Sequence, residues 1–281
     1  MTRKEEIRTL FEMSPDDMRR RAGERLVVCR DIDALHRHFA ASIATEIEVN
    51  NARGRRTSLI LPVGPTGQYP LLAELINERR IGLERCWFFM MDEQCDENGI
   101  VLPPEHPLSF RGVLNELFTS RVRPEFAIPP EQLIFPDHRN VHELEGLIES
   151  VGGVDTTYGG IGIHGHLAYN EPAPEVRDSN PRLVELNDFT RTINAIRSEI
   201  GGNLEGHPRK GITLGMRQLL GAERLRLYCR NGISLDWANT VLRLALFGEP
   251  GDDYPVTHIR GHRDYVVVTD EETARVPRYV V

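Results

Sequence analysis

The stretch GGIGIHGHLAYNEP, residues 159–172, places two histidines and one glutamate within eight positions, as His164, His166 and Glu171. Imidazole changes its protonation state near neutral pH and a carboxylate accepts protons, so these side chains could transfer protons to and from a substrate. They could also bind a divalent metal ion, because zinc accepts both imidazole and carboxylate ligands. Residue types and spacing alone leave both chemistries open, together with a histidine-rich structural turn.

A second candidate pair, Asp92 and Glu93, follows the apolar run CWFFMM. A carboxylate held against a carbon that neighbours a carbonyl can remove a proton from that carbon. The same residues could instead cap the element that follows them, since Asp is a common helix N-cap. Asp92 is therefore a candidate base and Glu93 a candidate substrate contact, with a structural role as the alternative.

A third candidate is the loop PVGPTG, residues 62–67, which follows the apolar run TSLIL. A turn of this kind ahead of a helix can present backbone N–H groups to a phosphate or a carboxylate. Its candidate binding residues are Gly64, Thr66 and Gly67. The loop lacks the lysine of a P-loop and the spacing of a dinucleotide fingerprint, so a plain strand-to-helix turn is the alternative.

The elements that must position these residues alternate between strands and helices. Apolar runs that end in loops predict strands, and amphipathic spacing predicts helices. Strands are predicted at 24–31, 57–64, 86–93, 156–166, 224–230 and 265–272, and helices at 31–52, 69–79, 108–118, 141–152, 216–222 and 235–248.

This alternation predicts an α/β fold in which a mainly parallel, doubly wound sheet carries helices on both faces. We expect a single domain over residues 24–281, preceded by a charged, helical N-terminal extension at 1–23. In open parallel sheets, ligands bind where loops converge outside the carboxyl ends of the strands. The three candidate loops each follow a predicted strand, so we expect them to converge.

Composition narrows the functions that need consideration. The formal net charge is -8 and the pI is near 5.7, which makes nucleic acid an unexpected partner because phosphate binding needs a concentrated basic face. No stretch approaches ~18 uninterrupted apolar residues, so no membrane span is expected. The four cysteines form no C-x-x-C pair, which fits packing residues in a reducing, cytoplasmic setting.

The three loops together resemble the glucosamine-6-phosphate deaminase/isomerase family, which is related to the 6-phosphogluconolactonases. The stretches typical of the family are LPTGSTP, MDEY with HPxSY, and GxDGHxAFNEP. This sequence has LPVGPTG at 61–67, MDEQ at 91–94 with HPLSF at 106–110, and GIHGHLAYNEP at 162–172. A further similarity is GITLGMRQLLGAERLRL at 211–227, and the order of these stretches extends the resemblance over roughly residues 24–275.

The resemblance implies an aldose-to-ketose reaction on an amino-sugar phosphate, with loss of ammonia and without a metal or an organic cofactor. It implies that Asp92 takes the proton from the carbon bearing the amine, that His166 assists ring opening at the sugar oxygen, and that Glu171 orients His166. His164 is included among the catalytic candidates as the neighbour of His166. The expected substrate-binding residues are Gly64, Thr66, Gly67, Glu93, Arg197 and Lys210.

His164 stands where the family has an aspartate, so a carboxylate that would support the neighbouring imidazolium is replaced by a second imidazole. If this stretch is a strand, His164 and His166 lie on one side at a separation of roughly 6.6 Å. Two unit charges at that distance repel by about 2.5 kcal/mol at an effective dielectric near 20. The histidine pair is therefore expected to resist double protonation.

A second departure concerns the phosphate of the substrate. The family usually has a lysine near the start of the helix predicted at 235–248, whereas this chain has Asp236 and Trp237 there. Since an acid cannot replace that cation, phosphate binding would rest on Thr66, the adjacent loop amides and another cation, such as Arg197 or Lys210. The substrate is accordingly expected to be a small-molecule sugar or amino-sugar phosphate, and a homo-oligomer is a compatible assembly.

Two other classes of function stay open. In the first, a metal-dependent sugar hydrolase or isomerase, His164, His166 and either Asp92 or Glu171 would hold a divalent ion. In the second, a regulatory protein that has lost catalysis, the altered site would bind a sugar phosphate without turning it over. Sensitivity to chelators distinguishes the first class, and stabilisation by ligand without turnover distinguishes the second.

Overall fold

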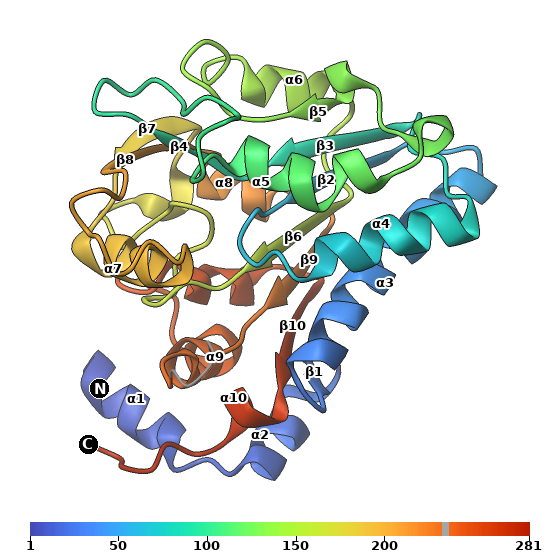
Figure 1. The fold of residues 1–281 in the computed structure, drawn as a ribbon. Helices are drawn as coiled ribbons and strands as arrows, with labels where there is room; N and C mark the ends of the chain where they lie inside the picture. The colour runs from blue at the N-terminus through green and yellow to red at the C-terminus, as the bar shows by residue number, and fades with distance from the viewer. Residues whose placement is uncertain (232–235) are drawn as a thin grey trace.

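The central feature of the structure, a computed structural model that describes residues 1–231 and 236–281, is a seven-stranded sheet in the order β1-β10-β9-β6-β2-β3-β5 (Figure 1). Every neighbouring pair of strands in it is parallel. Its strands are β1 Leu26–Cys29, β2 Thr57–Leu61, β3 Cys86–Met90, β5 Leu133–Ile134, β6 Thr156–Gly160, β9 Arg224–Tyr228 and β10 Tyr265–Asp270.

Helices cover both faces of this sheet, and each face has its own apolar core. The helices over one face are α3 Ile32–Ala52, α4 Gln68–Arg79 and α5 Phe110–Leu117. Those over the other face are α1 Arg3–Phe11, α2 Pro15–Ala22, α6 Leu144–Ser150, α8 Met216–Leu220, α9 Ala238–Phe247 and α10 Glu271–Ala274. The predicted single α/β domain with a doubly wound sheet is thereby confirmed.

The predicted helices have local reasons to begin where they do. Asp31 caps α3, because its carboxylate accepts a hydrogen bond from the Ala34 backbone N–H at 2.8 Å. The helix expected at 235–248 is observed as α9, which begins at Ala238, while Leu235 lies outside the described residues. Short 3₁₀ segments occur at Gly23–Arg25, Thr119–Arg121, Pro124–Phe126, Pro130–Gln132, Val176–Asp178 and Pro255–Gly261.

The charged N-terminal segment packs against α9 and contributes Leu10, Met13 and Met18 to the core. Arg243 of α9 is fully buried, and its Nε donates to the Leu10 carbonyl at 3.1 Å. At the surface, Arg3 pairs with Asp253 at 2.8 Å. The segment is helical as expected, and its buried contacts show that it is packed rather than pendant.

A second, three-stranded antiparallel sheet was not predicted. It has the order β4-β8-β7, with β4 Asp92–Cys95, β8 Lys210–Thr213 and β7 Arg182–Glu185, and helix α7 Asp188–Arg197 follows β7. In Figure 1 this sheet and α7 lie together on one side of the molecule. The strand predicted at 86–93 is consequently two strands, because the chain leaves the main sheet after Met90 and enters the small sheet at Asp92.

The strand order identifies where the candidate loops meet. From the boundary between β2 and β6, strand order runs outward through β3 and β5 on one side and through β9 and β10 on the other. Such a reversal leaves a crevice at the carboxyl ends of the two central strands. Residues 62–67 follow β2 and residues 161–172 follow β6, so both loops lie at this crevice. No helix in the described ranges combines the length and apolar character needed to cross a membrane.

Candidate active site

The loop at residues 62–67 is held tightly against its surroundings by two glycines. A Cβ atom on Gly160, the last residue of β6, would meet Pro65 Cδ at 2.7 Å. A Cβ on Gly67 would come within 2.3 Å of the His36 ring on α3. Only glycine lets β6 and α3 approach this loop so closely, and the approach places Thr66 at the carboxyl end of the sheet.

Asp92 begins β4 directly beyond the carboxyl end of β3, and it is only 7% exposed. Burial, followed by the negative charge of Glu93, raises the pKa of the Asp92 carboxyl to about 8. A buried carboxyl is harder to ionise because the charged form loses its hydration. Asp92 therefore exchanges its proton near neutral pH, as a general acid or base must.

Glu93 points to the other side of β4, where the protein itself uses its carboxylate. Oε1 accepts from the backbone N–H groups of Gln94 at 2.8 Å and Phe110 at 2.7 Å, and Oε2 accepts from that of Arg111 at 2.8 Å. These bonds satisfy orphan N–H groups in the first turn of α5. Sequence reasoning left a capping role as the alternative for this residue, and the observed contacts are of that kind.

His164 and His166 lie in a turn after β6 rather than on a strand. Gly165 between them has φ of +73°, which L side chains rarely adopt, and its carbonyl accepts from the Val256 N–H at 2.7 Å. The turn brings the two Nδ1 atoms to 3.2 Å, in direct hydrogen-bonding contact. The expected strand separation was therefore wrong, because the left-handed glycine folds the two rings toward one another.

Asn187, the N-cap of α7, connects this histidine pair to the helix. Its Oδ1 accepts from the Thr190 N–H at 3.0 Å, and its Nδ2 lies 2.8 Å from His164 Nε2. Its own backbone N–H donates to Glu171 Oε2 at 2.9 Å, while the buried Glu171 Oε1 has no partner among the described residues. The expected bond from Glu171 to His166 is not observed, and Glu171 instead contacts the start of α7.

The surroundings keep both imidazoles neutral. Burial is the main cause that lowers the pKa of His164, although the Asn187 contact and the charge of Glu171 oppose it. The pKa of His166 is lowered further, by burial first and then by the charges of His164 and Arg197. The expected resistance of the pair to double protonation agrees with these directions, with desolvation as the larger cause.

The ligand atoms of His164, His166 and Glu171 lie within 4.8 Å of one another, close enough for one ion to reach them. The hydrogen bonds compete with that use. The Asn187 amide already occupies His164 Nε2, and the two Nδ1 atoms face each other. An ion coordinated by these imidazoles would have to displace one of these contacts, so the arrangement fits a hydrogen-bonded pair better than a metal centre.

Positively charged and N–H groups gather at the neighbouring strand end. Arg197 of α7 lies over the Trp237 ring, with its guanidinium carbon 5.1 Å from the ring centre. The Arg197 side chain reaches solvent, yet desolvation by the atoms around it, followed by the charge of Arg230, lowers its pKa to about 10. Arg230 follows β9, and its charge also helps to lower the pKa of His36 against the 62–67 loop.

Three buried nitrogens in this group have no hydrogen-bond partner among the described residues: Arg230 Nε, Trp237 Nε1 and His36 Nε2. Buried N–H groups are normally paired, because leaving one unpaired costs on the order of 1–3 kcal/mol. We name His36, Arg197, Arg230 and Trp237 the anion end of the site. Arg230 was missed from the sequence, although its place at the carboxyl end of a predicted strand was the available signal.

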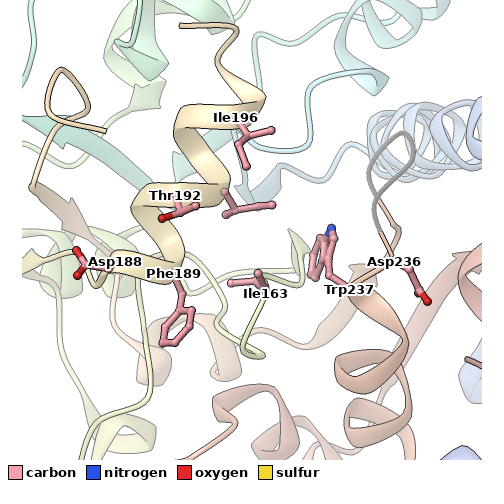
Figure 2. A pocket seen from close by; sticks show the side chains of 8 residues that line it. Ile163, Asp188, Phe189, Thr192, Ile196, Asp236 and Trp237 are labelled. Atoms are coloured by element: carbon pink, nitrogen blue, oxygen red, sulfur yellow. The ribbon is translucent and has the colours of Figure 1, made fainter. Parts of the chain in front are cut away.

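An apolar pocket of about 490 Å³ opens between α7 and the start of α9. Figure 2 shows Phe189, Thr192 and Ile196 of α7 on one side of it and Trp237 on the other, with Ile163 between them. The Phe189 ring lies edge-on to His164, with 6.2 Å between ring centres. The apolar side chains that line this pocket thus lie beside the histidine pair.

Lys210 of the second sheet and Tyr169 of the loop after β6 complete the surroundings of the site. Lys210, an expected substrate contact, lies opposite Cys95 of β4 and opposite Glu185 of β7 in the antiparallel strand register. Tyr169 stacks over β8, where a Cβ on Gly211 would meet its ring at 2.7 Å, and its buried hydroxyl has no partner among the described residues. The structure therefore gathers Asp92, the histidine turn and the anion end at the strand ends, with Lys210 on the adjoining small sheet.

The fold is that of the α/β proteins that include glucosamine-6-phosphate deaminases and 6-phosphogluconolactonases. A monomeric glucosamine-6-phosphate deaminase superposes with a TM-score of 0.78 at 23% identity, over 90% of this chain and 100% of its own. A 6-phosphogluconolactonase from Thermotoga maritima superposes with a TM-score of 0.60 at 15% identity, over 87% of this chain and 98% of its own.

Sequence similarity extends to glucosamine-6-phosphate deaminases. A glucosamine-6-phosphate deaminase from Caenorhabditis elegans is 28% identical over 72% of this chain and 74% of its own length. One from Clostridium perfringens is 24% identical over 90% of this chain and 99% of its own. No family model matches the chain. The chain is a distant homologue of the glucosamine-6-phosphate deaminases, as its sequence motifs indicated.

Proposed function

We propose that this protein is a sugar-phosphate aldose–ketose isomerase/deaminase that resembles glucosamine-6-phosphate deaminase. The observation that carries the proposal is Asp92, a buried carboxyl with a pKa of about 8 at the carboxyl end of the parallel sheet. The loop after β6 carries two neutral imidazoles, and the anion end carries two arginines, Arg230 after β9 and Arg197 on α7. This combination supplies a base, a hydrogen-bonding group for sugar oxygens and an anchor for a dianion.

The reaction begins with ring opening. The bond between C1 and the ring oxygen breaks, and the proton of the anomeric hydroxyl is in effect moved to that oxygen, which gives the open-chain aldehyde. His166 assists at the ring oxygen, where negative charge develops as the bond breaks. The 2.8 Å contact from Asn187 to His164 and the 3.2 Å contact between the histidines hold His166 in place for this role.

Proton transfer between two carbons follows. The Asp92 carboxylate takes the proton from C2, the carbon bearing the amine, and the proton returns at C1, while the C1 oxygen gains a proton and the amine nitrogen loses one. The resulting imine at C2 adds water and releases ammonia, so an amino-aldose phosphate and water give a ketose phosphate and ammonia. Asp92 must be ionised to begin this step, so its pKa of about 8 predicts that kcat/KM rises with pH until about pH 8.

The anion end supports a phosphorylated substrate. Arg197 and Arg230 provide two guanidinium groups, and Arg230 Nε and Trp237 Nε1 lack hydrogen-bond partners within the described residues. Guanidinium groups bind phosphate oxygens through paired, charge-assisted hydrogen bonds. Together with Thr66 and the loop amides, these groups would replace the lysine whose absence from the sequence made phosphate binding doubtful.

The direct test is to incubate the protein with glucosamine 6-phosphate and to measure both ammonia and ketose phosphate. Equal amounts of the two products are expected, with far weaker turnover of unphosphorylated glucosamine. Neither turnover nor thermal stabilisation by any of a panel of amino-sugar phosphates would refute the proposal. Stabilisation without product would instead support a regulatory binding protein.

The clustering of His164, His166 and Glu171 within 4.8 Å favours one second candidate, a metal-dependent sugar isomerase or hydrolase. The two candidates differ in their response to a chelator. Under the proposed mechanism, activity is the same before and after EDTA treatment and dialysis. Loss of activity that zinc or manganese restores would establish the metal-dependent reaction instead.

A further inference from the structure

The orientation of the Asn187 side chain is fixed by the helix that it caps. A backbone N–H can only donate, so the Asn187 atom that lies 3.0 Å from the Thr190 nitrogen must be the oxygen Oδ1. The atom turned toward His164 is therefore the amide nitrogen, at 2.8 Å from His164 Nε2. Because Nδ2 carries only hydrogens and no lone pair, it donates, and His164 Nε2 accepts.

The tautomer of His164 determines the tautomer of His166. A neutral histidine that accepts at Nε2 carries its proton on Nδ1. His164 Nδ1–H faces His166 Nδ1 at 3.2 Å, so His166 accepts there and carries its own proton on Nε2. The Thr190 hydroxyl lies 3.4 Å from His164 Nε2 and 3.5 Å from His166 Nδ1, where it can donate to either lone pair.

We infer that Asn187 acts as a positioning residue that holds His166 as the neutral Nε2–H tautomer, so that His166 donates a hydrogen bond to the sugar and cannot act as a base through Nε2. The inference rests on the proposed function only for the identity of the acceptor, a sugar oxygen. His166 lies against Gly162, where a Cβ would come within 1.8 Å of Nε2, so the absent side chain is what leaves room for the Nε2 edge.

The residue at position 164 decides whether His166 Nδ1 accepts or donates a hydrogen bond. An aspartate there, as in the resembled family stretch, would accept from His166 Nδ1–H and leave a lone pair on Nε2. His164 reverses the direction, because in the observed network it donates to His166. Such a neutral donor aimed at a developing oxyanion stabilises it without transferring a proton. In this chain Asn187 thus donates to His164, His164 donates to His166, and His166 is left to donate to the substrate.

The tautomer can be measured without substrate. Protein labelled with ¹⁵N-histidine gives two-bond ¹H–¹⁵N correlations that distinguish a protonated from an unprotonated ring nitrogen, and His166→Gln assigns the His166 signals by their loss. The expected result is a protonated Nε2 and an unprotonated Nδ1 at His166 near pH 8. A protonated Nδ1 at His166 in the unmodified protein would overturn the inference.

Asn187→Asp reverses the first donor while keeping a good helix N-cap. Its carboxylate would accept from His164 Nε2–H, so His164 Nδ1 becomes an acceptor and His166 is expected to change to the Nδ1–H tautomer. Asn187→Ser also keeps the cap but removes the amide, so a mixture of tautomers is expected. Asn194→Asp adds the same charge elsewhere on α7 and should leave the tautomer unchanged.

Kinetics provide the second measurement. With glucosamine 6-phosphate, Asn187→Asp is expected to lower kcat by roughly 10²–10³-fold with little change in KM, the size typical of losing one donor to a developing oxyanion. Inactivity of the unmodified protein with the expected tautomer would refute the proposed function alone. An unchanged tautomer in folded Asn187→Asp and Asn187→Ser proteins would refute the positioning role, whatever the substrate.

Discussion

The histidine turn and the anion end lie at neighbouring strand ends, but they treat their polar groups in opposite ways. In the turn, the nitrogens from Asn187 to His164 and His166 are connected, with contacts of 2.8 and 3.2 Å. At the anion end, three buried nitrogens have no hydrogen-bond partner among the described residues: Arg230 Nε, Trp237 Nε1 and His36 Nε2. Within residues 1–231 and 236–281, the protein itself supplies the hydrogen bonds of the turn, whereas the anion end keeps nitrogens that could bond to a ligand.

This contrast assigns different tasks to the two regions. Groups that act on the reacting bonds must already have the correct orientation, because reorganisation during the reaction adds to the barrier. Groups that hold a remote phosphate can gain their hydrogen bonds on binding. Substitutions in the turn should therefore change kcat, and substitutions at the anion end should mainly change KM.

The largest effect is expected at Asp92, the proposed base. Asp92→Asn keeps the side-chain shape but removes the proton acceptor, so turnover of glucosamine 6-phosphate should fall by roughly 10³–10⁵-fold while binding persists. Steady-state kinetics with a thermal-shift measurement of binding test this. Activity within tenfold of the unmodified protein would exclude Asp92 as the base.

The same substitution should stabilise the protein at high pH. Folding raises the pKa of Asp92 from an ordinary value of 3.8 to about 8, so the folded state binds an extra proton between these values and loses stability as pH rises through them. At ~1.4 kcal/mol for each pH unit, Asn should gain up to about 6 kcal/mol relative to Asp above pH 8. Denaturant unfolding should show the gain at pH 9 and little difference at pH 4; equal stability at both would contradict the raised pKa.

The anion end should respond through KM. Arg230→Met and Arg197→Met each remove charge-assisted bonds worth about 1.5–3 kcal/mol, so KM for glucosamine 6-phosphate should rise roughly 10- to 100-fold. Arg209→Met is the matched control, because Arg209 pairs with Glu205 at the surface, at 2.9 Å. Should Arg230→Met leave KM unchanged while Arg197→Met raises it, Arg230 would not belong to the anion end.

The smallest effect is expected for His164→Asp, which changes the charge inside the turn. A carboxylate beside His166 favours the imidazolium, so the pKa of His166, now held well below its ordinary value, should rise. An NMR titration of His166 in both proteins measures this directly, and an unchanged titration would show that His164 does not influence its neighbour.

The sequence predicted six of the seven strands of the main sheet, chiefly from apolar runs that end in loops, and missed β5, which is only two residues long. The runs at β2 and β3 pack between two layers of helices, and this position leaves little ambiguity. The small sheet was missed because its strands are short and polar: β7 alternates between half-buried and exposed residues, and β4 consists of DEQC. Their pairing depends on β8, more than a hundred residues after β4, which no local pattern reveals.

The candidate site residues also divide into those that the sequence could identify and those that it could not. Asp92, His164, His166 and Glu171 could be selected because their types and spacing are visible in the chain. Asn187 could not, since it acts through a helix that follows an unpredicted strand. The contact between the two histidines depends on a single left-handed residue, Gly165, whose conformation the sequence allows but does not require.

The N-cap of α7 also has a consequence for local unfolding. Asn187 bonds simultaneously to Thr190, to His164 and, through its backbone, to Glu171. Helix ends fray more readily than helix centres, and fraying of this first turn would break all three bonds in one event. The amide hydrogens of Asn187 and Thr190 should then exchange with solvent at a rate that reports the fraction of molecules whose histidines have lost their orientation, so the folding of one helical turn and the chemical competence of the site are a single equilibrium.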